Sequence, residues 1–186
     1  AEFLVFTDKF QCYKARLSDF DDGKASLLGD YLPQKLGFEP GENMVSLQFC
    51  GDYKGFVLFF FENGKAAKVP LSAYETKTNR RKLTGAYSDK SSLVTAMALE
   101  EDTQIALYSS DGRAAIFSTA QLLPKTTRNT QGVAVMTLKK KAVLQNAVLL
   151  ENSGITNPGR YRTKTIPSAG ALLKEEDAAE KQQSFE

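Results

Sequence analysis

The sequence has no histidine and no tryptophan, and only two of its 186 residues are cysteines. Without histidine it lacks the commonest general base, the usual metal ligand and every Ser-His or Cys-His nucleophile pair. It also lacks a phosphate-binding loop of the GxxxxGKS/T type. No apolar run approaches the roughly 20 residues of a membrane-spanning helix, and no charged-then-apolar signal segment opens the chain. These absences argue against an independent enzyme and predict a soluble, cytoplasmic protein without cofactors or metal.

The few residues that could carry reactive or metal-binding chemistry are badly placed for it. Cys12 and Cys50 have neither the number for a disulfide framework nor the spacing of a zinc site, so we expect buried free thiols. The acidic pairs Asp21-Asp22 and Glu100-Glu101 fall in predicted turns, where solvated loop charge is the simpler interpretation.

The apolar residues point to β structure. They make up 42% of the chain, enough for a core, and the aromatic ones are 12 Phe and 7 Tyr, which favour strands. The length fits one domain or a run of small repeats. An all-β core is therefore predicted.

Three landmarks recur along the chain and indicate repeats of about 50 residues. Apolar strand, polar turn and second strand occur around positions 10, 64 and 112, and the turn chemistry returns at 159, with spacings of 54, 48 and 47. A glycine follows the first three turns after 19, 21 and 20 residues: these are Gly29, Gly85 and Gly132. An apolar strand comes next, at 45–49, 94–99 and 144–150.

The landmarks define three complete repeats and a truncated fourth, at about 3–54, 55–102, 103–154 and 155–173. Short strands with Gly turns at this period are typical of propeller-like arrays. Hairpin turns are predicted near Asp8 to Phe10, Glu62 to Gly64, Ser110 to Gly112 and Asn157 to Gly159. The run Phe59-Phe60-Phe61 is predicted to be a buried strand rather than a platform for stacking bases.

The net charge of +2 conceals an uneven distribution. Residues 1–52 carry 5 basic against 9 acidic side chains, 53–173 carry 17 against 8, and 174–186 carry 2 against 5. A basic middle suggests a polyanion-binding surface. Residues 174–186 form an acidic C-terminal tail. Its segment Glu175 to Glu186 is expected not to hold the fold together and to compete with the polyanion for the basic surface. Leu172 to Gln183 is expected to form a short helix or a disordered tail.

Several motifs resemble blades of the C-terminal domain of bacterial type IIA topoisomerase A subunits, those of DNA gyrase and topoisomerase IV. The resemblance covers about residues 3–170 and rests on the order and spacing of the motifs. The motifs are Gly64-Lys65-Ala66-Ala67-Lys68-Val69-Pro70-Leu71-Ser72-Ala73-Tyr74 followed by Arg80-Arg81 and Gly85, then Gly112-Arg113-Ala114-Ala115-Ile116-Phe117-Ser118 with Thr127-Arg128-Asn129-Thr130-Gln131-Gly132-Val133, and Tyr161-Arg162-Thr163-Lys164-Thr165-Ile166-Pro167.

The resemblance implies a β-pinwheel over residues 1–173, in which neighbouring blades exchange strands and duplex DNA bends around a basic rim without sequence preference. It implies no catalytic residue here, because the family's catalytic tyrosine lies in another domain. The parent would be an ATP-hydrolysing topoisomerase, a heterotetramer with an ATPase B subunit, and this fragment would be monomeric. The gyrase branch of the family carries a motif, the gyrase box, that reads Gln-Arg-Arg-Gly-Gly-Lys/Arg-Gly. The segment Asn79 to Gly85 keeps both arginines and the final glycine but lacks the Gln and the paired glycines, which favours a topoisomerase IV-like member.

Positive charge on a rigid, curved repeat frame is what sequence-independent bending of DNA needs. The predicted DNA-binding residues are Lys65, Lys68, Lys77, Arg80, Arg81, Lys82, Arg113, Lys125, Arg128, Lys139, Lys140, Lys141, Arg160, Arg162 and Lys164. Two alternatives stay open. Each could be an ordinary solvated charge, and Lys139 to Lys141 could merely protect a strand edge. The domain could also be a protein-interaction platform without nucleic-acid binding.

Overall fold

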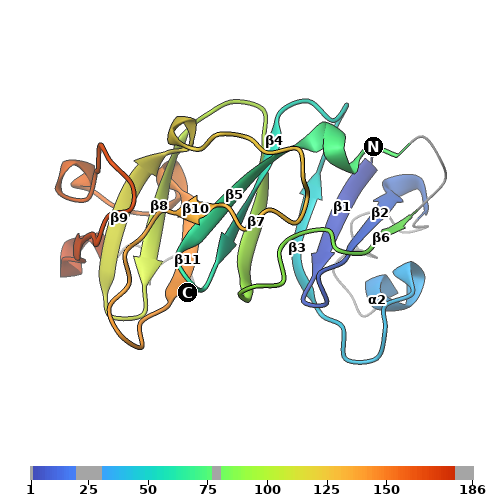
Figure 1. Ribbon diagram of the computed structural model, residues 1–186, viewed down its shortest axis with the longest axis horizontal. Coiled ribbons are helices and arrows are strands. Elements are labelled where there is room, and N and C mark those ends of the chain that lie inside the picture. The colour runs from blue at the N-terminus through green and yellow to red at the C-terminus, as the bar shows by residue number, and fades with distance from the viewer. Residues whose placement is uncertain (1, 20–30, 77–80, 179–186) are drawn as a thin grey trace.

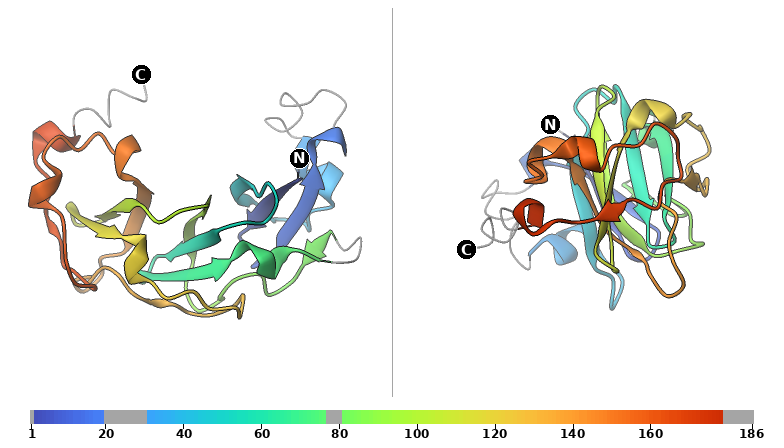
Figure 2. Two further views of the ribbon diagram at one scale, coloured as in Figure 1. Left: turned by 90° about the horizontal axis from the view of Figure 1, so that it is seen from above. Right: turned by 90° about the vertical axis from the view of Figure 1, so that its left-hand side faces the viewer.

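The computed structural model describes residues 2–19, 31–76 and 81–178. Over these residues the chain forms three four-stranded antiparallel sheets set one beside the next in an arc (Figures 1 and 2), which confirms the all-β pinwheel class. The first sheet is β3 (Met44–Phe49), β1 (Glu2–Thr7), β2 (Cys12–Arg16) and β6 (Lys82–Leu83). The second is β10 (Val133–Ala134), β5 (Lys65–Pro70), β4 (Phe56–Phe61) and β7 (Leu93–Leu99). The third is β11 (Leu144–Leu149), β8 (Gln104–Ser109), β9 (Arg113–Ser118) and β12 (Ala171–Leu172).

Helices are few and short in the described part of the chain. The α-helix α2 (Tyr31–Leu36) lies against the first sheet, and residues 175–178 form one further α-helical turn. The 3-10 helices are η1 (Leu17–Asp19), η2 (Leu71–Tyr74), η3 (Thr119–Gln121), η4 (Leu150–Asn152) and η5 (Pro158–Arg160). None of the described helices is both long and apolar enough to cross a membrane.

Three of the four predicted hairpin turns are confirmed, between β1 and β2, β4 and β5, and β8 and β9. Their equivalent positions have left-handed backbone, with φ of 60° at Phe10, 83° at Gly64 and 81° at Gly112. Glycine adopts this conformation without strain, whereas Phe10 adopts it as a non-glycine residue.

The fourth predicted hairpin, at Asn157 to Gly159, is wrong. Pro158 instead begins η5, where proline fits the first helical turn. The segment therefore forms a turn of 3-10 helix, and no pair of long strands flanks it among the described residues. The partial repeat contributes β12 to the third sheet.

Each sheet takes its outermost strand from the following repeat. Leu83 pairs with Cys12, Val133 with Ala66, and Ala171 with Ala114. The repeats are therefore joined by hydrogen bonds as well as by side-chain packing, and the partial fourth repeat completes the third sheet.

This register corrects the glycine landmark. Counted from these pairs, the equivalent of Gly132 is Gly170 in the fourth repeat and Lys82 in the second, not Gly85. A Cβ at Gly132 would lie 2.0 Å from Ala66 O, whereas Gly85 has nothing within 4 Å. The landmark fails because β10 approaches β5 so closely that only glycine fits, and β6 meets β2 without that constraint. Gly29 lies outside the described residues.

The hairpin strands are apolar on both faces because each face packs against a neighbour. In β4, Phe59 and Phe61 join the core shared with the first sheet, and Phe60 joins the core shared with the third. Phe59 meets Phe6 at 5.1 Å and Tyr87 at 5.6 Å between ring centroids. The predicted burial of the phenylalanine run is confirmed, as is that of the two free cysteines.

Local segments cover the two end faces of the array. Leu32 of α2 and Phe38 pack on Tyr13 and its neighbours at the first sheet. At the third sheet, Tyr161 of the partial repeat packs on Tyr108. Among the described residues, each end sheet thus has apolar side chains of a local segment packed on its face.

The expectation that the acidic tail is dispensable is wrong at one residue. Residues 175–178 are helical, and Asp177 is buried. Its carboxylate accepts hydrogen bonds from Tyr161 Oη at 2.5 Å, from Thr156 N and Oγ1 at 2.8 and 2.9 Å, and from Asn157 N at 3.2 Å. Burial alone would raise the pKa of Asp177, but these donors lower it to about 2. Residues 179–186 lie outside the described part.

Lys68 fastens the second blade to the third. Its side chain is buried, and Nζ donates to Asp102 Oδ1 at 2.8 Å, Thr119 O at 3.1 Å and Leu122 O at 3.3 Å. Nζ also lies 4.4 Å from the centroid of the Phe56 ring. The bond from Lys68 and a second from Thr119 lower the pKa of Asp102.

We expect Lys68→Ala to lower the free energy of unfolding by about 1–3 kcal/mol, because two buried carbonyl groups lose their donor. Lys65→Ala, three residues away and only half-buried, should change it by no more than about 0.5 kcal/mol. Urea unfolding of both variants measures the difference. Equal stability of the two would contradict the role given to Lys68.

We expect Asp177→Ala to destabilise the domain at neutral pH by about 1–3 kcal/mol, because buried donors lose their acceptor. The stability that the carboxylate contributes is present above its unfolded pKa of about 3.9 and is lost as the pH falls toward its folded value of about 2. The midpoint temperature of thermal unfolding should therefore fall more steeply between pH 6 and pH 2 for the wild type than for Asp177→Asn. Parallel curves would show that Asp177 does not titrate as described.

Candidate nucleic-acid interface

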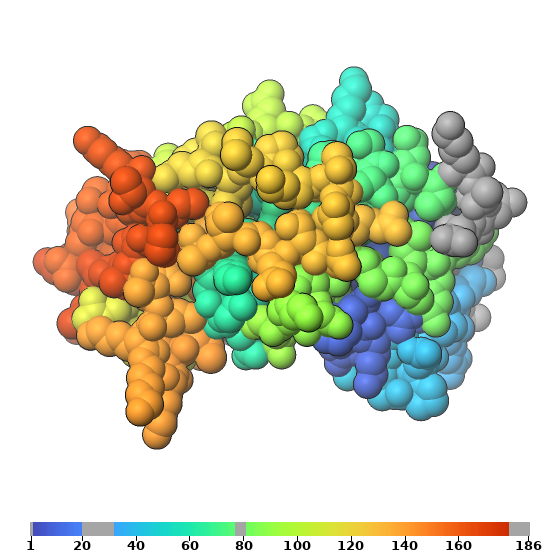
Figure 3. Space-filling model, in the orientation of Figure 1, coloured from blue at the N-terminus to red at the C-terminus, as the bar shows by residue number. Residues whose placement is uncertain are grey.

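The outer segments of the repeats form the convex side of the arc. After each hairpin the chain makes a short 3-10 helix, η1, η2 or η3. In the third repeat, residues 119–134 form an outer segment that runs outside the hairpins to β10, the strand added to the second sheet. On the opposite, concave side, the inner strand β7 contacts both β3 and β11. Figure 2 (left) shows the crescent, and Figure 3 faces its convex side, with the outer segment of residues 119–134 in yellow to orange across the middle.

Most of the predicted cations that the structure describes are exposed. The exposed ones are Arg81, Lys82, Lys125, Lys139, Lys140, Lys141, Arg160, Arg162 and Lys164. Lys65, Arg113 and Arg128 are half-buried. Lys77 and Arg80 lie outside the described residues. The buried one, Lys68, corrects the sequence prediction, because its ammonium group is used between blades and cannot reach a phosphate.

Arg81 and Lys82 stand at the junction of the first two blades and already have acidic partners. Arg81 Nη1 lies 3.1 Å from Asp19 Oδ2, and Lys82 Nζ lies 3.9 Å from Glu39 Oε1. The two cationic side chains stay 67% and 41% exposed. Exposed pairs of this kind contribute about 0–1 kcal/mol, so a phosphate group can replace the carboxylate at little cost.

Three arginines donate to backbone carbonyl groups. Arg160 does so through Nε and Nη2, which lie 3.4 and 3.2 Å from Leu172 O. Arg128 Nη1 donates to Ala73 O at 2.9 Å, which ties the outer segment of the third repeat to η2. Arg113 lies 3.9 Å from Asp111 and donates to Gly170 O at 3.4 Å. These contacts fix the guanidinium groups in place and use part of their hydrogen-bonding capacity.

The remaining candidates have no ion pair with any residue in the described ranges. They are Lys65, Lys125, Lys139, Lys140, Lys141, Arg160, Arg162 and Lys164. Lys139 to Lys141 lie in a turn closed by a bond from Ala142 N to Lys139 O, not on a strand, so the edge-protection alternative does not apply. Of the remaining candidates, Arg160 donates to Leu172 O and Arg162 Nε to Gln104 Oε1 at 2.9 Å, which are neutral acceptors, so the positive charge of the whole group is left for an external anion.

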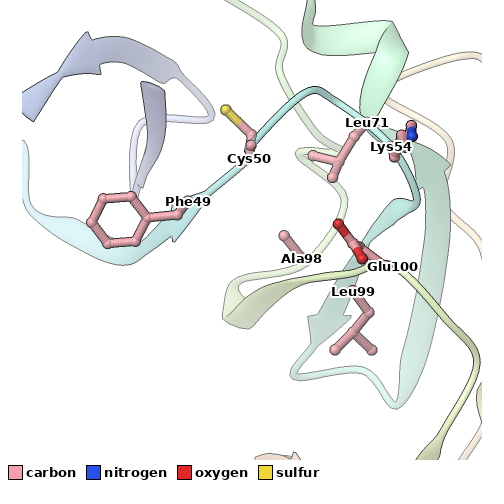
Figure 4. Close-up of a pocket in the computed structure, with 8 residues that line it drawn as sticks. Phe49, Cys50, Lys54, Leu71, Ala98, Leu99 and Glu100 are labelled. Carbon is pink, nitrogen blue, oxygen red and sulfur yellow. The ribbon is translucent and has the colours of Figure 1, made fainter. Parts of the chain in front are cut away.

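The hollow between the first and second blades offers little chemistry (Figure 4). Phe49, Cys50, Leu71 and Leu99 line it, with the exposed Lys54 and Glu100 beside them. Burial raises the pKa of the Cys50 thiol, which keeps it protonated at neutral pH. Glu100 and Glu101 are both exposed, as predicted. The pair Asp21-Asp22 lies outside the described residues.

No known protein family matches the sequence, and no curated protein matches it. Among solved structures, the C-terminal domain of DNA topoisomerase IV matches with a TM-score of 0.76 and 18% identity, over 94% of this chain and 60% of that one. The DNA gyrase A C-terminal domain matches with 0.63 and 14%, over 95% and 62%. The E. coli ParC C-terminal domain matches with 0.62 and 10%, over 94% and 77%.

The chain thus spans about three fifths of the length of the first two of these domains. At such low identity the agreement concerns the fold. The chain has the β-pinwheel fold of the C-terminal domains of topoisomerase IV and gyrase A, as the motifs in its sequence predicted.

Proposed function

We propose that this chain is a non-catalytic domain that binds duplex DNA on its convex side, without sequence preference, and bends it toward the catalytic core of a type II topoisomerase. The main support is the number of exposed cations, which come from the second, third and fourth repeats. Such cations suit the phosphate backbone, which attracts positive charge whatever the base sequence. The shared fold supports the same assignment by analogy.

The parent enzyme in this proposal hydrolyses ATP and is a heterotetramer with an ATPase B subunit, working in the cytoplasm where bacterial DNA lies. This chain alone is a monomer. The partial gyrase box, Asn79 to Gly85, favours a topoisomerase IV-like parent over a gyrase.

In this proposal the contacts come from two groups of residues on the basic part of the chain. The stretches of sequence that follow the second and third hairpins, and the fourth predicted turn, contribute Lys77, Arg80, Arg81, Lys82, Lys125, Arg128, Arg160, Arg162 and Lys164. The residues directly after the hairpin glycines, and one further turn, contribute Lys65, Arg113, Lys139, Lys140 and Lys141. Lys68 is left out because it is buried.

We expect the wild type to bind two unrelated duplexes of equal length with similar affinity, and log affinity to fall linearly with log salt. Replacing Arg81, Lys82 and Lys125 together with Gln should make that slope shallower by up to about 2.7, at about 0.9 per lost phosphate contact. Fluorescence anisotropy across salt concentrations measures the slope.

The matched control replaces Lys9, Lys54 and Lys90 with Gln. These lysines are exposed and lie outside the outer segments, and their loss changes the net charge equally. An equal loss of slope in both variants would indicate only a general charge effect. No binding of the wild type at low salt would overturn the proposal and favour the protein-interaction platform. An unchanged slope in the first variant but a loss after Lys139→Gln, Lys140→Gln and Lys141→Gln would move the DNA path to that turn.

A further inference from the structure

The outer segment of the third repeat holds a large apolar side chain out in solvent. Leu123 is 77% exposed, compared with 56% or less for the other exposed large apolar residues in the described ranges. Its neighbour Leu122 is 3% exposed and belongs to the core between the second and third blades. The side chains therefore change from buried to exposed within one residue.

The backbone on both sides of Leu123 is fastened to the neighbouring blade. Leu122 O accepts a hydrogen bond from Lys68 Nζ at 3.3 Å, and Lys125 N donates to Lys68 O at 2.8 Å. Between them, Pro124 restricts its own φ and keeps Leu123 in extended backbone. Leu123 is thus held away from the surface by a short, anchored segment and cannot easily fold back onto the core.

Two cations of the third repeat follow Leu123 within five residues, and a hydrogen bond to the backbone of Lys164 links this segment to the fourth repeat. Lys125 is exposed, and Arg128 is fixed on η2 through Ala73 O. Gln121 Nε2 donates to Lys164 O at 3.0 Å, which brings the outer segment of the fourth repeat alongside. The carboxylate of Asp102 is paired with Lys68, which also binds Leu122 O. The apolar tip therefore stands in a positively charged setting.

We propose that Leu123, supported by Pro124, is a wedge that enters the minor groove of the bound duplex and opens one base step where the DNA bends over the middle of the arc. This inference rests on the proposed function. Leucine and proline side chains that enter the minor groove unstack a step and kink the duplex, while flanking cations bind the adjacent phosphates. A wedge needs no base-specific contact, so it is compatible with binding that ignores sequence.

The test compares Leu123→Ala and Leu123→Gln with the wild-type chain on a duplex labelled with a fluorophore pair at its ends. Both variants should unfold at the wild-type temperature, because the side chain is exposed. Both should bind the duplex about tenfold more weakly, because an apolar contact is lost, and energy transfer should show a smaller bend. The slope of log affinity against log salt should stay unchanged, because no phosphate contact is lost. Leu172→Ala, which removes a leucine that is 56% exposed in β12, is the matched control and should match the wild type.

Netropsin, which fills the minor groove of A·T-rich DNA, provides the second measurement. It should weaken binding of the wild type to the level of Leu123→Gln and leave that variant unaffected. If the wild type binds and bends DNA but both Leu123 variants do so equally well, the wedge is rejected and the proposed function stands. If the wild type binds no duplex at low salt, the proposed function fails first.

Discussion

Every hairpin strand of this protein must bury two apolar faces, and the rest of the structure follows from that constraint. A sheet with one apolar face can stand against solvent, but β1, β4 and β8 have apolar residues pointing both ways. Each blade therefore needs a neighbour on either side. The middle blade has a neighbouring blade on each side. Each terminal blade has one neighbouring blade, and its other face packs against α2 or the partial fourth repeat. The array is an arc with both end faces covered.

The donated strands extend the same logic to the backbone. The second strand of each hairpin is β2, β5 or β9. Its outer edge would be unpaired if the next repeat did not supply β6, β10 or β12. The connection to that strand has to cross the outside of the array. Because this crossing segment packs mainly through its ends, as Leu122 and the backbone of Lys125 illustrate, its middle can hold charged or apolar side chains in solvent. Strand exchange thus places connecting segments on the convex side, where their exposed side chains are free to bind a partner.

Similar lysines acquire different roles through this arrangement. Lys68 and Lys125 lie opposite each other, joined by a backbone hydrogen bond, yet the side chain of one is buried between blades and that of the other is exposed. A buried ammonium group requires compensating acceptors, and Asp102, Thr119 O and Leu122 O provide them. The same three contacts stiffen the loop that presents Leu123. A structural contact thereby sets the geometry of the surface that we propose for DNA.

The sequence by itself determined the repeat length, the three left-handed turn positions, the strands buried on both faces and the excess of positive charge in the middle, because these depend on local pattern and backbone preference. Only the tertiary structure decided that Lys68 is internal, that Lys82 rather than Gly85 is equivalent to Gly132, that Asn157 to Gly159 forms no hairpin and that Asp177 is buried. Each of these depends on contacts between distant residues: Asp102 is 34 positions from Lys68, and Asp177 is 16 from Tyr161. Local sequence propensity does not determine contacts between residues this far apart in the chain. The packing of one repeat on the next determines them.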